Sequence, residues 1–174
     1  MKYTDQIIKL VTAALLAAMT CVATMVIQIP SGNEGYIHPG DAFVILSGII
    51  LGPIYGGFSA GIGSSLADLL SGYAVYTLPT FIIKFLAALT ASYTYRYLRK
   101  FSVIIAGVLA SFVVTFGYFL YDLIVSGTFM TAILDIPFNL LQNTVGIILA
   151  SIILPLLMKV PQVKTMVKAH KTSI

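Results

Sequence analysis

The sequence contains few charged residues and no tryptophan. Of its 174 residues only 9% are charged, whereas 59% are hydrophobic. Soluble domains carry about 25% charged residues. A chain with so few charges could not cover a surface that faces water, so we expect lipid to be its solvent. Its single cysteine, Cys21, cannot form an intrachain disulfide and offers no metal-ligand spacing, so no metal and no other cofactor is expected.

Motifs for catalysis are missing as well. No glycine-rich loop is followed by the lysine and hydroxyl residue that bind nucleotide phosphates, and no serine lies in a nucleophile-elbow pattern. The chain is therefore predicted not to be an enzyme, and any active transport must draw its energy from another protein. The net charge of +4 comes without a basic cluster interleaved with aromatics, so nucleic acid is not an expected partner.

Long apolar stretches predict an all-α membrane protein with six transmembrane helices, forming a single integral membrane domain over residues 1–174. Turn clusters such as Pro30–Asn33 separate these stretches. The expected helices cover residues 6–29, 41–51, 54–70, 77–97, 102–125 and 136–158. The second and third are shorter than the roughly 20 residues of a full crossing, so we expect them to be tilted, irregular or partly spanning.

The distribution of basic residues predicts the orientation in the membrane. With six crossings, nine of the ten basic residues fall on one side, which the positive-inside rule assigns to the cytoplasm. Both termini should then be cytoplasmic, and residues 159–174 should form a basic cytoplasmic tail. Most acidic residues fall near the opposite, outer side: Glu34, Asp41, Asp68, Asp122 and Asp135.

Lys84 is the basic residue that departs from this distribution. It lies about two turns below the outer end of the predicted helix 77–97. A lysine at such depth usually faces a cavity or a partner, because an unpaired charge in the membrane is costly. The candidate partners are Asp68, Asp122 or an anionic group on a substrate, and snorkelling of the side chain towards the interface is the alternative.

A set of polar side chains gathers at the same outer level. Asn139 and Asn143 are four residues apart and share a helix face, as do Tyr118 and Asp122. Interhelical hydrogen bonds and an interfacial aromatic belt would also explain them. Amides, tyrosines and one lysine against apolar walls suit a pocket for a small polar aromatic or carboxylate molecule. The predicted substrate-binding residues are Lys84, Tyr118, Asp122, Asn139, Gln142, Asn143, His38 and Tyr73.

Two further features have more than one interpretation. His38 and Asp41 are three residues apart, which is a weak metal signal, and Asp41 is expected instead to cap the helix that starts there. Small residues spaced four apart form two stripes on the first helix, and such stripes let helices or a partner protein approach closely. The stripes are Ala14 with Ala18, and Ala13 with Ala17.

The segment from Tyr36 to Lys84 resembles a known family. Its motifs are Gly35–Phe43, Leu51–Gly57, Gly61–Tyr73 and Pro79–Lys84. They are similar to those of the S components of energy-coupling factor (ECF) vitamin transporters, in the branch that includes riboflavin and hydroxymethylpyrimidine or pyridoxine transporters. Size, helix number and inward termini extend the resemblance over the chain.

This resemblance implies a vitamin-binding subunit of a multi-pass importer in a prokaryotic plasma membrane. Such subunits bind a vitamin at the outer side, dock on a transmembrane T component with two cytoplasmic ATPase subunits, and topple to carry the site inward. It also implies that an alanine stripe of the first helix, Ala14 with Ala18 or Ala13 with Ala17, contacts the T component. The absence of tryptophan departs from S components that stack their ligand on that residue, and disfavours thiamin or biotin.

The choice of vitamin depends on Lys84. If an aspartate neutralises it, a neutral ring such as pyridoxine or hydroxymethylpyrimidine is favoured, and this is our expectation from the five outer acids. If Lys84 is free to meet the substrate, an anionic vitamin such as pantothenate fits better, and riboflavin is a further possibility. The alternatives to an S component are a small membrane enzyme and a channel or carrier that works without partners.

Overall fold

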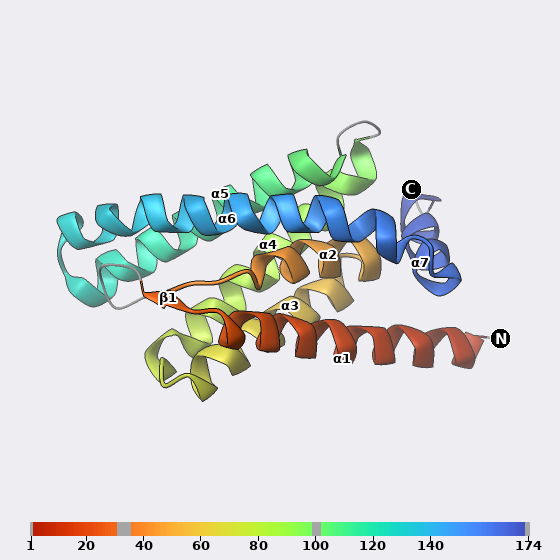
Figure 1. The fold of residues 1–174 in the computed structure, drawn as a ribbon, viewed down its shortest axis with the longest axis horizontal. Helices are drawn as coiled ribbons and strands as arrows, with labels where there is room; N and C mark the ends of the chain where they lie inside the picture. Colours follow the sequence, from red (N-terminus) through yellow and green to blue (C-terminus); the bar gives the residue numbers. More distant parts are fainter. Residues whose placement is uncertain (1, 31–35, 99–101, 173–174) are drawn as a thin grey trace.

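The computed structural model describes residues 2–30, 36–98 and 102–172 and forms an elongated bundle of helices (Figure 1). Both labelled termini lie at the same end of the bundle (Figure 1). Strands β1 (Ile29–Pro30) and β2 (Tyr36–Ile37) pair in antiparallel fashion after the first helix. The helices are α1 (Lys2–Val26), α2 (Asp41–Leu51), α3 (Pro53–Leu70), the 3-10 turn η1 (Ala74–Tyr76), α4 (Thr77–Tyr97), α5 (Ser102–Ser126), α6 (Phe129–Leu157) and α7 (Pro161–Thr172).

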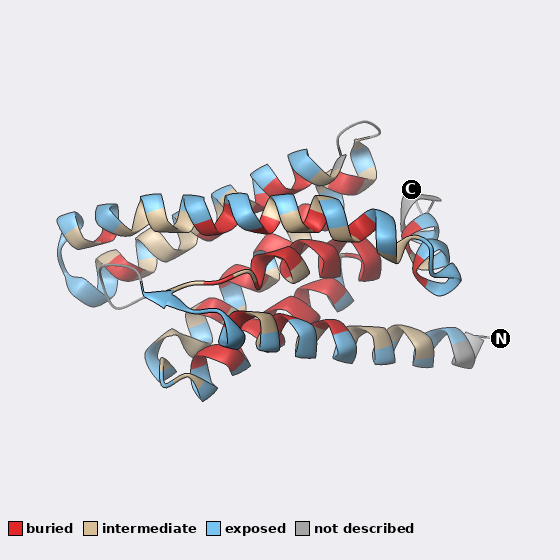
Figure 2. Cartoon of the chain, in the orientation of Figure 1, coloured by how far each residue is buried: buried red, intermediate tan, exposed pale blue. Residues whose placement is uncertain are grey.

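Helix α2 forms the centre of the core. Ten of its 11 residues are buried, and it contacts α1, α3, α4, α6 and α7 (Figure 2). Eleven residues span about 16 Å, roughly half of the apolar thickness of a bilayer. Gly52 then takes a φ of 83°, a conformation that glycine adopts without strain, and Pro53 starts α3 in the opposite direction. The short α2 and α3 therefore form a hairpin within the bundle.

The remaining long helices surround α2 as neighbours in chain order. Helix α1 packs on α3, α3 on α4, α4 on α5, and α5 on α6. The close contact between α1 and α3 requires a glycine at position 63, because a Cβ there would lie 2.4 Å from the backbone oxygen of Ala17. The start of α2 therefore meets the second turn of α4, at Lys84, and the middle of α6, at Gln142, and the first half of α6 extends beyond it.

Four helices in the described residues are long and apolar enough to cross a membrane. They comprise Asp5–Val26, Ala74–Tyr97, Val103–Ser126 and Phe129–Leu157, and α2 is a shorter apolar helix. The predicted all-α architecture is therefore confirmed. The six crossings and the cytoplasmic termini stay predictions, because α2 and α3 together form a hairpin of short helices.

Most predicted helix bounds agree with the structure, but the last long helix was placed too late. The predicted ranges 41–51 and 77–97 coincide with α2 and α4. Helix α6 begins at Phe129, well before the predicted residue 136, and contains Pro137. A proline removes one backbone hydrogen bond and usually bends or ends a helix, yet here the helix continues on both sides of it. Asp135 and Asn139 consequently lie one turn apart on a single helix.

The predicted basic tail contains a helix, α7. Val163 and Val167 are buried in the core of the bundle, and α7 contacts α2 and α4. Lys164 and Lys168 are exposed. An amphipathic helix of this kind buries its apolar stripe and leaves its basic stripe outside. Helix α7, which covers most of the predicted tail, is therefore part of the fold.

Candidate ligand-binding site

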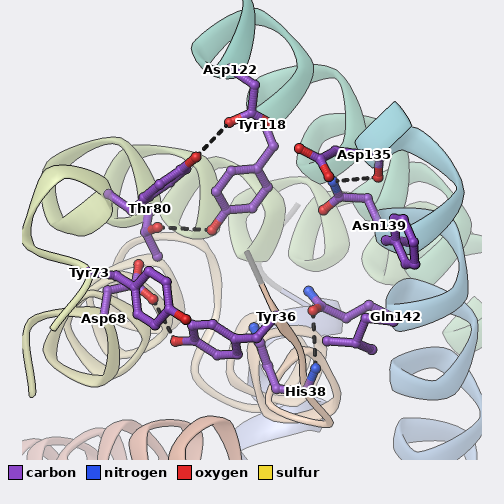
Figure 3. Close-up of a pocket in the computed structure, with 13 residues that line it drawn as sticks. Tyr36, His38, Asp68, Tyr73, Thr80, Tyr118, Asp122, Asp135, Asn139 and Gln142 are labelled. Atoms are coloured by element: carbon purple, nitrogen blue, oxygen red, sulfur yellow. Dashed lines mark hydrogen bonds between the residues drawn. The ribbon is translucent and has the colours of Figure 1, made fainter. Parts of the chain in front are cut away.

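A cavity, whose lining residues are drawn in Figure 3, lies towards the end of the bundle away from the termini labelled in Figure 1. Its volume is about 580 Å³, counting the space at its mouth. The loop before α2, the end of α3, η1 and the helices α4, α5 and α6 all contribute to its walls. The lining residues are Tyr36, Ile37, His38, Asp68, Tyr73, Tyr76, Thr80, Tyr118, Asp122, Asp135, Phe138, Asn139 and Gln142.

Tyrosine hydroxyls bind two of the carboxylates in the cavity wall. The hydroxyl of Tyr36 donates to Oδ1 of Asp68 at 2.8 Å, and the hydroxyl of Tyr76 donates to Oδ1 of Asp122 at 3.1 Å (Figure 3). Burial raises the pKa of the Tyr36 phenol well above its ordinary value, and the nearby charge of Asp68 adds to this shift. Tyr36 also packs on Tyr73, with ring centroids 4.9 Å apart. The wall is thus aromatic, with hydrogen-bond acceptors behind the rings.

A buried ion pair lies beneath the cavity. The Nζ of Lys84 on α4 is 2.5 Å from Oδ1 of Asp41 on α2, and the two side chains are 0% and 3% exposed. Gln142 on α6 donates from Nε2 to Oδ2 of Asp41 at 2.9 Å, and its Oε1 accepts from the backbone N–H of His38 at 3.2 Å. The lysine also lies 5.3 Å from the ring centroid of Tyr118. This network joins α2, α4, α6 and the loop before α2.

His38 connects the cavity to α1. Its Nδ1 lies 3.3 Å from the hydroxyl of Thr24, which is buried on α1. The residue is almost fully buried, and burial lowers the pKa of His38 to about 4, with a smaller opposing effect from Asp41. The imidazole is therefore neutral near pH 7.

Asp41 was expected to cap α2, and Lys84 was expected to pair with Asp68 or Asp122. Both expectations were wrong. Asp68 and Asp122 bind tyrosine hydroxyls, and Lys84 pairs with Asp41. Asp41 does not cap its helix, because Gly40 occupies the cap position and no side-chain cap bond forms there. Leaving Lys84 buried without a counter-charge would cost several kcal/mol, about 3–5, which exceeds the roughly 1 kcal/mol of a helix cap.

The structure brings most of the predicted site residues into one cavity. His38, Tyr73, Tyr118, Asp122, Asn139 and Gln142 line it. Two predicted residues lie elsewhere. Lys84 belongs to the ion pair beneath the cavity, and Asn143 donates to the Thr115 hydroxyl at 3.1 Å, which links α5 with α6.

Several cavity residues were not in the predicted set. Thr80 lies four residues before Lys84 on α4 and shares a hydrogen bond with the Tyr118 hydroxyl at 2.9 Å, so helical spacing could have identified it. Phe138 lies four residues before Gln142 on α6 and could have been found in the same way. Tyr36 and Asp68 are 32 positions apart in the sequence, and only the folded chain brings them together. Glu34, another outer acid, lies outside the described residues.

The two alanine stripes of α1 face different surroundings. Ala13 and Ala17 are half-buried against α3, where the Ser59 hydroxyl donates to the backbone oxygen of Ala13 at 2.8 Å. Ala14 and Ala18 are exposed. Of the two stripes, only the one formed by Ala14 and Ala18 is therefore available to a partner.

No metal site is evident in the parts of the chain that the structure describes. Within them, no group of three or more histidine, cysteine, aspartate or glutamate residues could hold a metal ion. Asp41, which with His38 gave the weak metal signal, uses its two oxygens for Lys84 and Gln142.

Fold and cavity together define a multi-pass helical membrane protein with a polar, aromatic-lined cavity. A family model described as "ECF-type riboflavin transporter, S component" matches residues 4–159. The chain belongs to this family of transporter S components, which is not a class of enzymes.

The chain is also similar to two other proteins. A solved S component of a bacterial ECF transporter superimposes with a TM-score of 0.70 over 88% of this chain and 97% of that chain, at 22% identity, which demonstrates a shared fold. An uncharacterized protein of Pyrococcus woesei is 34% identical over 99 residues, which are 56% of this chain and 66% of that protein. The match thus spans slightly less than two thirds of the length of this relative.

Proposed function

We propose that this chain captures a neutral, hydroxylated aromatic heterocycle, with pyridoxine or hydroxymethylpyrimidine as the favoured vitamins. The observation that carries the proposal is the ion pair of Lys84 with Asp41, since it removes the lysine from the cations a substrate could meet. None of the described residues that line the cavity is a lysine or an arginine. Tyr36, Tyr73 and Tyr118 supply aromatic surface for a planar ring.

The charge of the cavity argues against pantothenate. Asp68, Asp122 and Asp135 line the wall, and a substrate carboxylate placed near them would be repelled. Hydroxyl and amino groups, in contrast, donate to carboxylates, and both favoured vitamins carry such donors beside an aromatic ring. The site therefore favours ligands that donate hydrogen bonds from their periphery.

Riboflavin is the second candidate. It is named in the description of the family model that matches this chain. Its flavin ring would suit the aromatic wall, and its chain of hydroxyl groups would suit the carboxylates.

The membrane arrangement belongs to the same proposal. Six crossings, with the α2–α3 hairpin supplying two of them, would place both termini in the cytoplasm. In support, Asp5, Ile8 and Lys9 of α1 share a groove with α7, so the basic tail and the start of α1 lie at one end. The exposed pair Ala14 and Ala18 would dock on the T component, and the two ATPase subunits would supply energy.

Mass spectrometry of the compound released from the purified protein tests the substrate directly. Calorimetric titration with pyridoxine, hydroxymethylpyrimidine, riboflavin and pantothenate then ranks the candidates, and we expect one of the first two to bind most tightly. Tight binding of pantothenate alone would contradict the proposal. Uptake by liposomes that contain this chain without T component or ATPases would favour a self-sufficient carrier instead.

A further inference from the structure

The ring of His38 is held in one orientation by its own loop. Its Nδ1 accepts a hydrogen bond from the backbone N–H of Gly40 at 3.1 Å, two residues along the chain. The Thr24 hydroxyl lies against the same nitrogen. The packing there leaves no room for a side chain on Gly40, because a Cβ would lie 2.1 Å from the Thr24 oxygen and 2.8 Å from Nδ1. Position and rotation of the imidazole are therefore fixed before any ligand arrives.

This orientation determines which nitrogen carries the proton. A neutral imidazole has one nitrogen that donates and one that accepts. Since Nδ1 accepts from Gly40, the proton resides on Nε2. The charged groups that surround the ring, Asp41 and Lys84, are paired with each other, and burial keeps the pKa of His38 low, so the ring stays neutral.

Nε2 of His38 has no hydrogen-bond partner among the described residues, and it keeps some accessible surface although the residue is only 8% exposed. His38 lines the cavity and packs against Tyr36, with ring centroids 5.4 Å apart. The wall of the cavity thus contains an unpartnered donor at His38, together with acceptors at the carboxylates of Asp68, Asp122 and Asp135.

We propose that His38 donates a fixed Nε2–H hydrogen bond to the bound vitamin and thereby selects heterocycles with an unprotonated ring nitrogen or a carbonyl at that point. This inference rests on the proposed function and specifies its substrate class. The ligand would present one acceptor edge to His38 and its hydroxyl or amino donors to the carboxylates. A pyridine, a pyrimidine and a flavin ring all carry such an acceptor, whereas a ring with only C–H edges does not.

Two substitutions separate this role from simple support of the loop. His38→Asn keeps an acceptor at the Nδ1 position, because an asparagine oxygen commonly accepts from the N–H two residues later. It removes the donor at the Nε2 position, which the shorter amide does not reach. His38→Gln places an amide donor near the Nε2 position and weakens the bond to Gly40. A role in ligand binding and a role in loop support therefore predict opposite effects for the two variants.

Affinities for pyridoxine, hydroxymethylpyrimidine and riboflavin would be measured on the unmodified protein and both variants, together with melting temperatures of the empty proteins. We expect His38→Asn to bind at least about tenfold more weakly with an unchanged melting temperature, because a donor to the ligand is lost. His38→Gln should bind within a few-fold of the unmodified protein. Unchanged binding by His38→Asn would overturn the proposal.

A spectroscopic test decides the proton position without any ligand. The sequence contains two histidines, His38 and His170, so nitrogen-15 labelling of histidine gives two imidazole spectra, and His170→Gln assigns them. We expect a protonated Nε2 and an unprotonated Nδ1 for His38 at pH 7. A proton on Nδ1 would overturn the inference even if the vitamins bind. Failure of all three vitamins to bind, with the expected spectrum, would instead refute the proposed substrate class.

Discussion

Lys84 and Asp41 form an ion pair 2.5 Å long between α4 and α2, and both side chains are sealed from solvent. Gln142 binds the second carboxylate oxygen of Asp41, so α6 is tied to the same point. A buried pair of this kind is costly to break because the remaining charge has no solvent to compensate it. The pair therefore holds together the three helices beneath the cavity.

Replacing one member of this pair should destabilise the empty protein. Lys84→Met leaves the Asp41 carboxylate buried without its counter-charge, a change that typically costs about 3–5 kcal/mol. We expect a clearly lower melting temperature in detergent, together with weaker vitamin binding because the floor of the cavity shifts. Lys84→Met combined with Asp41→Leu should recover much of the stability, since removing both charges leaves no unpaired ion.

The outcome also tests the assignment of the substrate charge. A Lys84→Met protein that is as stable as the unmodified one but has lost binding would mean that the lysine meets the substrate. That result would favour an anionic vitamin. It would contradict the neutral ring proposed from the ion pair.

The two alanine stripes of α1 provide a matched pair of variants for partner docking. Ala14→Leu with Ala18→Leu changes the exposed face and should abolish uptake and assembly with the T component, with vitamin affinity unchanged. Ala13→Leu with Ala17→Leu inserts bulk where α1 contacts α3, so we expect lower stability, by roughly 1–3 kcal/mol for each added side chain. Pull-down with the T component and a thermal melt distinguish the two effects. Intact assembly in the first variant would exclude this face as the docking surface.

Periodicity and composition predicted the fold class and most helix bounds, because α2 and α4 are apolar and end at glycine, proline or polar clusters. They could not predict the pairing of Lys84 with Asp41. Its members lie 43 positions apart, and the predicted partners were Asp68, Asp122 or an anionic group on the substrate. Asp41 becomes the partner of Lys84 because α2 is short and its start lies inside the bundle beside α4. Tertiary packing therefore decided a question that helical spacing left open.

The two stripes on α1 illustrate the same limit. Alanines at either register share a helix face, and their spacing is identical. Which face turns inward depends on Gly63 and Ser59 of α3, residues some 46 positions away from their contacts on α1. Asn143 is likewise an asparagine on the same helix as Asn139, yet its amide binds Thr115 and so links α5 to α6.

Asn139 and Asn143 supply a second matched pair, four residues apart on α6. Asn139 lines the cavity, so Asn139→Ala should weaken vitamin binding by about tenfold at nearly constant melting temperature if its amide contacts the ligand. Asn143→Ala removes the bond to Thr115 and should cost about 1 kcal/mol of stability with little change in affinity. Calorimetry and thermal melts on both proteins provide the comparison. The opposite pattern would mean that the ligand lies deeper, against Asn143.

The orientation of the chain in the membrane can be tested with single cysteines in a Cys21→Ala background. Thr128→Cys places an exposed thiol between α5 and α6, near the cavity end, and Lys164→Cys places one on the exposed face of α7. Because the basic residues gather at the end that carries α7, the positive-inside rule predicts a cytoplasmic α7. A membrane-impermeant maleimide should therefore label Thr128→Cys in intact cells and label Lys164→Cys only after permeabilisation. Labelling of Lys164→Cys in intact cells would place α7 outside, and with it would reject both the cytoplasmic termini and an outward-facing cavity.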